Sequence, residues 1–286
     1  MIADYVEEYQ EGVPLTEVQQ LLNKQDSAVN QILYKCEATL TIEVIRQRAQ
    51  SLLAGHISVS SCYKKVAGFT SHRGIPFIGA SVNVQECTWS FQREPNLAQL
   101  NLSAPLDIAP EQGVNLDVCV VTSAGDMYIA VRSFALALDL TSLQLIAQYI
   151  TSDDEVDEAL QFPDFVAWQL DMFDDEEGLA GQAYWQHYLS NSLPDALNLP
   201  YKKREIDTSN VTYSQLSHQF TGEFVSQVEQ FAKTLDLTTF QVIQLSRWWL
   251  LARLAPQHTF LTQLNYDPRS ESEEFEGALG CYNKEL

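Results

Sequence analysis

The strongest pattern of hydrophobic and polar positions lies in residues 131–150, VRSFALALDLTSLQLIAQYI. Apolar side chains follow a strand-like pattern as far as Leu138, and after Asp139 they recur at helical spacing. The pattern predicts a buried strand that runs into a helix, with Asp139 at the junction. Because Asp139 and Thr141 lie where the first backbone N–H groups of the helix lack partners, we expect them to cap the helix.

The residues before this unit alternate between helical and strand patterns. Helices are expected over residues 14–22, with Pro14 near the first turn, and over 41–54, with Gly55 as the cap. Strands are expected over residues 29–40, 57–66, 82–91 (as an edge strand), 114–121 and 127–138, whereas 97–106 leads into a turn. Turn-forming residues at 123–126 predict a hairpin between the last two strands. This mixed order predicts an α/β sandwich around one mixed sheet.

Residues 151–178 mark a change in composition, because they are rich in Asp and Glu and contain no Lys or Arg. Their spacing is not that of a calcium-binding loop, so a solvated helix surface and linker is expected. Beyond them, helices are predicted over residues 184–189, 223–235 and 239–254, and strands over 211–220 and 258–266. Apolar residues nearly encircle the helix at 239–254, which predicts that it is central and buried.

Composition and charge exclude several classes of protein. The chain has 286 residues, of which 45% are hydrophobic, so it can bury a core in one large or two ordinary domains. A net charge of −21 repels phosphate backbones and anionic membranes, so we expect no nucleic-acid or membrane partner, and the charge suits a basic partner surface. Neither a signal peptide nor a run of about 18 apolar residues is evident, which predicts a cytoplasmic protein.

Candidate chemistry is sparse. The five cysteines are widely spaced and form no CxxC motif, so they predict neither a disulfide framework nor a zinc site, and we expect most of them to be small apolar strand residues. Ser133 and Ser142 flank the junction at Asp139 without a base nearby in the sequence. His56 follows a helix end, where capping or packing is the more common role.

Several segments together resemble the condensation domains of nonribosomal peptide synthetases. In the first half, PLTEVQQLL (14–22) is similar to the family's opening helix, and LLAGHISVSS (52–61) to its RHE-x-LR segment. In the second half, the similar segments are YWQHYL (184–189), LPDALNLPYKKR (193–204), the buried-helix motif that begins at TTF (238–240) and GALGCYN (277–283). The order and spacing of these pieces match over nearly the whole chain.

The resemblance implies a chloramphenicol-acetyltransferase-like fold of two lobes. In that family, carrier proteins approach from opposite sides and present substrates on phosphopantetheine arms in a tunnel between the lobes, and no cofactor of the domain's own is expected. We expect a complete first lobe in residues 1–176 and the beginning of a second, incomplete lobe in residues 177–286. A whole condensation domain is about half as long again.

The family's HHxxxDG signature aligns with residues 134–140, and most of it is lost. Phe134 and Ala135 replace the two histidines, and Leu140 replaces the glycine, so only Asp139 remains. In the family, the second histidine is credited with positioning or deprotonating the attacking amine. The methyl group of Ala135 cannot accept a proton or a hydrogen bond.

The family's aspartate pairs with an arginine, and the arginines of the RHE-x-LR segment are absent here. Gly55 and Ser60 stand in their places. Arg132 and Arg269 are therefore the candidate partners of Asp139.

Two functions follow from the resemblance. The first is a condensation-like domain without peptide-bond-forming activity, which serves a nonribosomal peptide or hybrid polyketide assembly line as a structural, docking or recruitment module. Its partners would be carrier-protein or neighbouring synthetase domains. The alternative is a divergent acyltransferase that joins a carrier-bound acyl or aminoacyl thioester to an amine or alcohol. That activity needs a substitute base, for which His56, His187 and His218 are the candidates. The resemblance counts against a third hypothesis, that the chain is an acidic interaction protein unrelated to synthetases.

Overall fold

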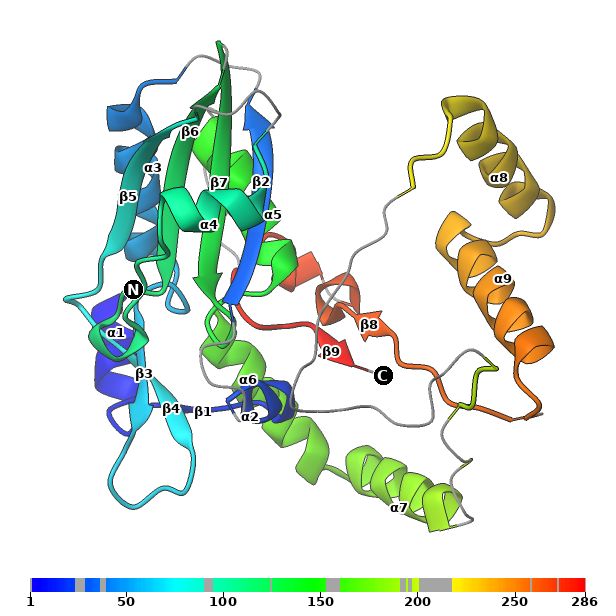
Figure 1. Cartoon of the computed structure of the whole chain (residues 1–286). Helices are drawn as coiled ribbons and strands as arrows, with labels where there is room; N and C mark the ends of the chain where they lie inside the picture. Colours follow the sequence, from blue (N-terminus) through cyan, green and yellow to red (C-terminus); the bar gives the residue numbers. More distant parts are fainter. Residues whose placement is uncertain are drawn as a thin grey trace. The chain divides into compact units, whose positions relative to one another are not determined.

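The computed structural model describes residues 2–23, 29–36, 40–89, 95–123, 125–152, 160–190, 194, 197–200, 218–257, 259–271 and 273–285. The chain forms two compact units (Figure 1). The first contains residues 1–182 together with 264–286, and the second contains residues 183–263. The expected lobe boundary between residues 176 and 177 stays a prediction.

A four-stranded mixed sheet lies at the centre of the first unit, as the sequence predicted. Its strand order is β2 (Val29–Cys36), β7 (Asp126–Phe134), β6 (Leu116–Ser123) and β5 (Val82–Thr88). β5 runs parallel to β6, whereas the other neighbours are antiparallel. The predicted hairpin is β6–β7, and β5 is an edge strand as expected.

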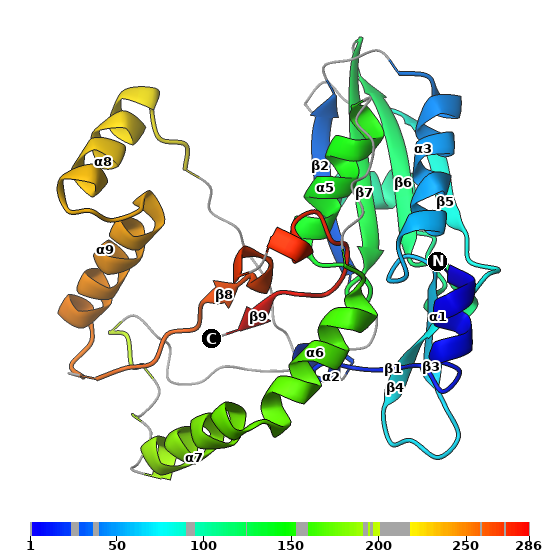
Figure 2. The same ribbon diagram turned by 180° about the vertical axis from the view of Figure 1, so that it is seen from behind.

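Helices cover both faces of this sheet (Figures 1 and 2). α3 (Ile42–Gly55) and α5 (Leu140–Thr151) lie on one face, and α4 (Leu97–Ser103) lies on the other. Successive side chains of a strand point to opposite faces, so β6 contributes to two cores. Val118 and Val120 pack in the core under α3 and α5, whereas Cys119 and Val121 pack in the core under α4.

A buried ion pair joins the two central strands on the α4 side. Asp117 and Arg132 are opposite each other in the β6–β7 register, and both side chains are 0% exposed. Nε and Nη2 of Arg132 donate to Oδ1 of Asp117, at donor–acceptor distances of 3.0 and 2.6 Å. Nη1 of Arg132 also donates to Asn101 and to the Ala104 carbonyl. The pair thus fixes α4 to the sheet.

The remaining elements of the first unit surround the sheet. A three-stranded sheet has the order β1 (Val13–Pro14), β4 (His72–Pro76) and β3 (Ser61–Lys65). The helices are α1 (Ile2–Glu8), α2 (Glu17–Leu22), α6 (Phe162–Asp174) and α7 (Glu176–Ser190), the last of which continues into the second unit. Short elements complete the list: η1 (Pro110–Gln112), β8 (Asn265–Tyr266), η2 (Pro268–Glu271), η3 (Glu273–Phe275) and β9 (Lys284–Glu285).

The second unit contains α8 (Gly222–Thr234) and α9 (Thr239–Leu254), both close to their predicted bounds. The side chains of Thr221 and Thr238 cap these helices. The prediction that α9 is buried is wrong: Trp249 is 66% exposed and Ile243 54%, whereas Val242 is buried. An all-apolar helix needs neighbours on every side, and α8 can cover only one face of α9.

Several predicted bounds are also wrong. Pro14 lies in β1 and not in α2. The N-cap of α2 is Thr16, whose side chain accepts a hydrogen bond from the Gln19 backbone N–H, so the helix begins only after Thr16. β7 ends at Phe134 instead of continuing to Leu138, and 97–103 is a helix capped by Asn96. β3 begins only at Ser61, and within 259–266 only Asn265–Tyr266 is a strand. Residues 211–217 lie outside the described residues.

All five cysteines are buried, which confirms their expected role as small apolar residues. Four lie in β2, β3, β5 and β6, and Cys281 lies in a loop. Within the described ranges, no cluster of three or more His, Cys, Asp or Glu side chains is arranged to hold a metal ion. None of the described helices combines the length and the apolar character needed to span a bilayer.

The Asp117–Arg132 pair generates a stability prediction. Asp117→Asn leaves the Arg132 guanidinium buried without its counter-charge, so we expect the free energy of unfolding to fall by about 3–5 kcal/mol. The matched control is Asp126→Asn, which breaks the half-exposed pair with Lys35 and should cost about 1 kcal/mol or less. Urea denaturation measures both, and equal losses would contradict the prediction.

Candidate functional site

The motif turn, residues 134–138, begins at the last residue of β7 and is held by polar side chains from distant segments. The Phe134 carbonyl accepts hydrogen bonds from the backbone N–H groups of Ala137 and Leu138. Gln19 of α2 donates to the Leu136 carbonyl, and Asn30 of β2 donates to the Leu138 carbonyl. Within this turn Ala135 is 3% exposed. The turn is therefore rigidly placed, although it carries neither of the histidines of the family signature.

Asp139 caps α5, as the sequence predicted, whereas Thr141, the other expected cap, lies within the helix. Oδ1 of Asp139 accepts hydrogen bonds from the backbone N–H and the hydroxyl of Ser142, and both donor–acceptor distances are 2.8 Å. A carboxylate is favoured here because the first turn of the helix presents unpaired N–H groups and the positive end of the helix dipole.

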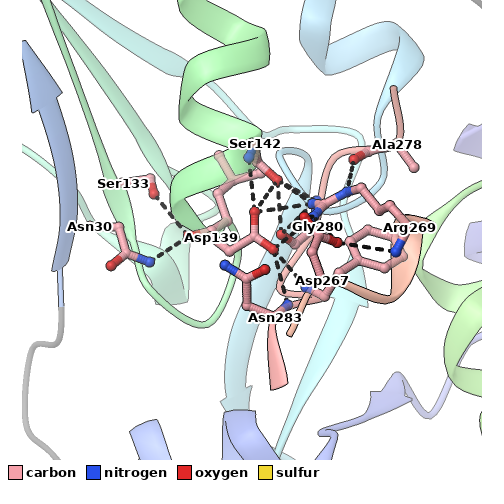
Figure 3. A network of polar contacts seen from close by, with 11 residues as sticks. Asn30, Ser133, Asp139, Ser142, Asp267, Arg269, Ala278, Gly280 and Asn283 are labelled. Carbon is pink, nitrogen blue, oxygen red and sulfur yellow. Dashed lines mark hydrogen bonds and ion pairs between the residues drawn. The ribbon is translucent and has the colours of Figure 1, made fainter. Parts of the chain in front are cut away.

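Arg269 is the ionic partner of Asp139, and Figure 3 shows the contact. Nη2 of Arg269 donates to Oδ1 of Asp139 over 3.0 Å, and Nη1 donates to Oδ2 over 3.1 Å. The two side chains are only 7% and 5% exposed. The other sequence candidate, Arg132, pairs with Asp117 instead. Sequence reasoning could not choose between them, because Arg269 lies 130 residues from Asp139.

The ion pair between Asp139 and Arg269, called the clasp below, also holds residues 278–283 against α5. Oδ2 of Asp139 accepts hydrogen bonds from the backbone N–H groups of Tyr282 and Asn283 over 3.0 and 3.1 Å. The Asp139 backbone N–H donates to the Gly280 carbonyl, and Nε of Arg269 donates to the Ala278 carbonyl. The Arg269 guanidinium lies 4.2 Å from the centre of the Tyr282 ring.

These contacts decide what Asp139 can do chemically. Each carboxylate oxygen already accepts from the guanidinium and from at least two other donors, so no lone pair remains to take a proton from a substrate. Asp139 is therefore a structural residue of the site and not a general base.

One cavity, the motif cavity, is lined by the motif turn. It has a volume of about 480 Å³, and its lining residues are Asn23, Val29, Tyr63, His72, Leu106, Ile108, Pro110, Glu111, Phe134 and Leu136. Phe134 contacts Tyr63 edge to face, with ring centres 5.7 Å apart.

His72 lines this cavity, and the sequence analysis did not single it out. Nδ1 of His72 lies 2.9 Å from Nδ2 of Asn23. Because an amide NH₂ group only donates, Nδ1 accepts, and the neutral imidazole carries its proton on Nε2. No local motif marks His72, since its partner lies 49 residues away.

A second cavity, the C-terminal cavity, adjoins the residues that the clasp holds. It has a volume of about 290 Å³ and is lined by Thr16, Glu17, Val18, Phe165, Gln169, Met172, Phe173 and residues 281–284. The Tyr282 hydroxyl is buried and has no hydrogen-bond partner among the described residues, and burial raises its pKa. Desolvation lowers the pKa of Lys284, which Glu17 partly opposes. The cavity thus combines an apolar wall with a few polar groups.

The three histidines proposed as substitute bases do not line either cavity. His56 follows α3, its backbone N–H caps the helix at the Leu52 carbonyl, and its side chain is buried. Burial lowers the pKa of His56 to about 4. His187 and His218 are exposed and belong to the second unit. A catalytic role for His56 stays a prediction.

Comparisons with known proteins agree on the class of fold. A family model described as Condensation domain matches residues 141–283. Tyrocidine synthase 3 of Brevibacillus parabrevis is 22% identical over 257 residues, which is 86% of this chain and 4% of that protein. The solved condensation domain of the Monacolin K polyketide synthase MokA has a TM-score of 0.76 and 15% identity, over 96% of this chain and 66% of that one.

A further solved structure, the X-domain in complex with OxyB from teicoplanin biosynthesis, has a TM-score of 0.65 and 14% identity, over 96% of this chain and 64% of that one. The chain thus has the mixed α/β fold of the solved condensation domains. The chain belongs to the condensation-domain family. It spans about two thirds of these two solved structures and 4% of the curated synthetase.

The clasp predicts how residues 264–286 are attached to the first unit. Arg269→Met removes the bidentate partner of a buried carboxylate, so we expect a loss of about 3–5 kcal/mol in the free energy of unfolding. We also expect faster hydrogen exchange of the Tyr282 and Asn283 amides. The control is Arg253→Met, an exposed arginine of α9. Unchanged exchange at Tyr282 and Asn283 would contradict the prediction.

His56 predicts a pH dependence of stability. In the unfolded chain a histidine gains a proton below about pH 6.5, whereas folded His56 stays neutral down to about pH 4. The unfolded state therefore binds more protons in this window, and His56 makes stability fall by about 3 kcal/mol as the pH falls through it. His56→Phe removes this contribution. Urea unfolding of both proteins at pH 7 and pH 4.5 measures the difference, and parallel pH profiles would refute it.

Proposed function

We propose that this chain is a condensation-family domain that binds carrier-linked partners of a nonribosomal peptide or hybrid polyketide assembly line without forming the amide bond. The observation that carries the proposal is the motif turn. Ala135 occupies the place of the family's base, and the one retained signature residue, Asp139, has all its acceptor sites filled. The scaffold of the site is kept, and its proton acceptor is missing.

The two cavities support a role in binding. Their volumes, about 480 and 290 Å³, lie in or near the range of small-molecule sites, about 300–1,000 Å³. Apolar side chains form much of both walls, and the polar lining comprises amide, hydroxyl and imidazole groups, the carboxylates of Glu17 and Glu111, and the amine of Lys284. We propose that they receive the phosphopantetheine arm of a carrier protein and the acyl or aminoacyl group on it, and that the domain needs no cofactor of its own.

The comparison with the X-domain supports a docking role. That solved structure is a complex with another protein, OxyB, so a similar fold serves there as a surface for a protein partner. For this chain we propose a carrier-protein or neighbouring synthetase domain. The net charge of −21 favours a partner with a basic surface, because opposite charges steer association.

One observation favours the alternative, a divergent acyltransferase: His72 places an imidazole in the motif cavity. Its orientation argues against a base, because Asn23 donates to Nδ1 and leaves Nε2 protonated. Nε2–H would donate a hydrogen bond to a substrate instead of taking its proton. The non-condensing function is therefore the better supported of the two.

An intact-mass assay separates the two functions. The purified chain is mixed with an aminoacyl-loaded acceptor carrier and an acyl-loaded donor carrier, and calorimetry measures binding in the same mixtures. We expect binding without product above background. Product that disappears in His72→Ala would establish the alternative, and neither product nor binding would overturn the proposed function.

Restoring one signature histidine should not restore condensation. Loss of a general base costs about 10²–10⁴-fold in rate, but an imidazole at the 3% exposed position 135 would have to enter a packed turn beside Phe134. We expect Ala135→His to give product at the background level in the intact-mass assay, with circular dichroism as the control for folding. A rise of a hundredfold would contradict the prediction.

A further inference from the structure

One part of this acidic chain lacks carboxylates. Residues 44–85 contain no Asp or Glu, although the whole chain contains 38. The same stretch carries Arg46, Arg48, Lys64, Lys65 and Arg73. The last three lie in the β3–β4 hairpin, drawn in cyan in Figure 1, where the connecting loop extends beyond the strands.

The register of the hairpin places cationic and ionisable side chains opposite each other. Lys64 pairs with Arg73, and Lys65 pairs with His72. Like charges opposite each other destabilise a sheet, so this arrangement is unfavourable for the hairpin alone. Arg73 is occupied, because its Nε and Nη2 donate to the Gly12 carbonyl and its guanidinium lies 4.1 Å from the centre of the Phe69 ring. Lys64 and Lys65 are exposed, and neither forms an ion pair within the described ranges.

Strand alternation separates the two lysines. Tyr63 and Lys65 lie on one face of β3, whereas Lys64 lies on the other. His72, directly opposite Lys65, shares the face of Tyr63, and both Tyr63 and His72 line the motif cavity. Lys65 therefore lies on the side of the hairpin that adjoins the motif cavity, and Lys64 lies on the side of Arg73.

This face offers two complementary donors to an anion. Lys65 supplies a full positive charge, and His72 supplies the Nε2–H group that its contact with Asn23 leaves free to donate. Among the described residues, Glu111 is the one carboxylate that lines the cavity, so an anion is favoured at the Lys65 side and not beside Glu111. A local cation is needed because the field of a chain with net charge −21 repels anions.

We infer that Lys65 and His72 bind the phosphate group of a carrier-linked phosphopantetheine arm whose thioester end enters the motif cavity. Lysine is a common phosphate ligand and acts as a compact point charge. The inference rests on the proposed function for the arm itself. It adds the residues that recognise the phosphate and the side from which the arm enters.

The test uses the full chain and two probes that differ only in the phosphate, 4′-phosphopantetheine and pantetheine. Binding of each is measured by nuclear magnetic resonance titration of ¹⁵N-labelled protein. We expect phosphopantetheine to bind more tightly, and Lys65→Gln to weaken it about tenfold without changing the affinity for pantetheine. The matched control is Lys64→Gln, which removes the same charge from the other face and should change the affinity less than about twofold.

Each other outcome has a defined meaning. Equal binding of the two probes would overturn the phosphate site and leave the binding of arms intact. Equal effects of Lys64→Gln and Lys65→Gln would also overturn it, since net charge alone would then explain the loss. If neither probe binds, both the phosphate site and the proposed binding of arms fail, whereas docking of a carrier domain is still measured by calorimetry.

Discussion

The carboxylate of Asp139 is the contact on which the candidate site depends. It caps α5, forms a bidentate ion pair with Arg269 and accepts the backbone N–H groups of Tyr282 and Asn283. A buried charge is costly unless it is paired and fully hydrogen-bonded, and here both conditions are met. One side chain therefore fixes the start of a core helix, the end of the motif turn and the return of residues 264–286. The walls of the C-terminal cavity follow from this placement.

The family signature is retained unequally, and the pattern has a physical meaning. Asp139, which organises the backbone, is present with its arginine, whereas the positions that would carry proton-transfer chemistry hold Phe134 and Ala135. Phe134 and Ala135 instead contribute apolar surface to the turn. The result is a turn that distant side chains hold in place and that carries no imidazole at residues 134 and 135. His72, the imidazole that does line the motif cavity, is oriented by Asn23 as a donor.

Charged residues are also distributed unevenly along the chain. The chain as a whole is strongly acidic, whereas the β3–β4 hairpin contains no carboxylates and places Lys65 on the strand face that it shares with Tyr63 and His72. A cationic site can bind an anion even on an acidic chain. The attraction between the anion and a lysine in contact with it exceeds the repulsion from distant carboxylates, because salt screens the distant charges. Partner docking and recognition of an arm can therefore use different parts of the surface.

The sequence alone determined the strand–helix unit around Asp139, the β6–β7 hairpin, the mixed sheet, the capping role of Asp139 and membership of the condensation family, because periodicity, turn residues and motif order are local signals. Only the tertiary structure decided that Arg269, and not Arg132, pairs with Asp139, since the two partners are 130 residues apart. It also decided the exposure of α9, because an apolar helix does not specify its neighbours, and the placement of His72 and Lys65, which depends on strand register. Contacts between segments that are distant in the sequence produce no local periodicity, and the polar contacts of this site are of that kind.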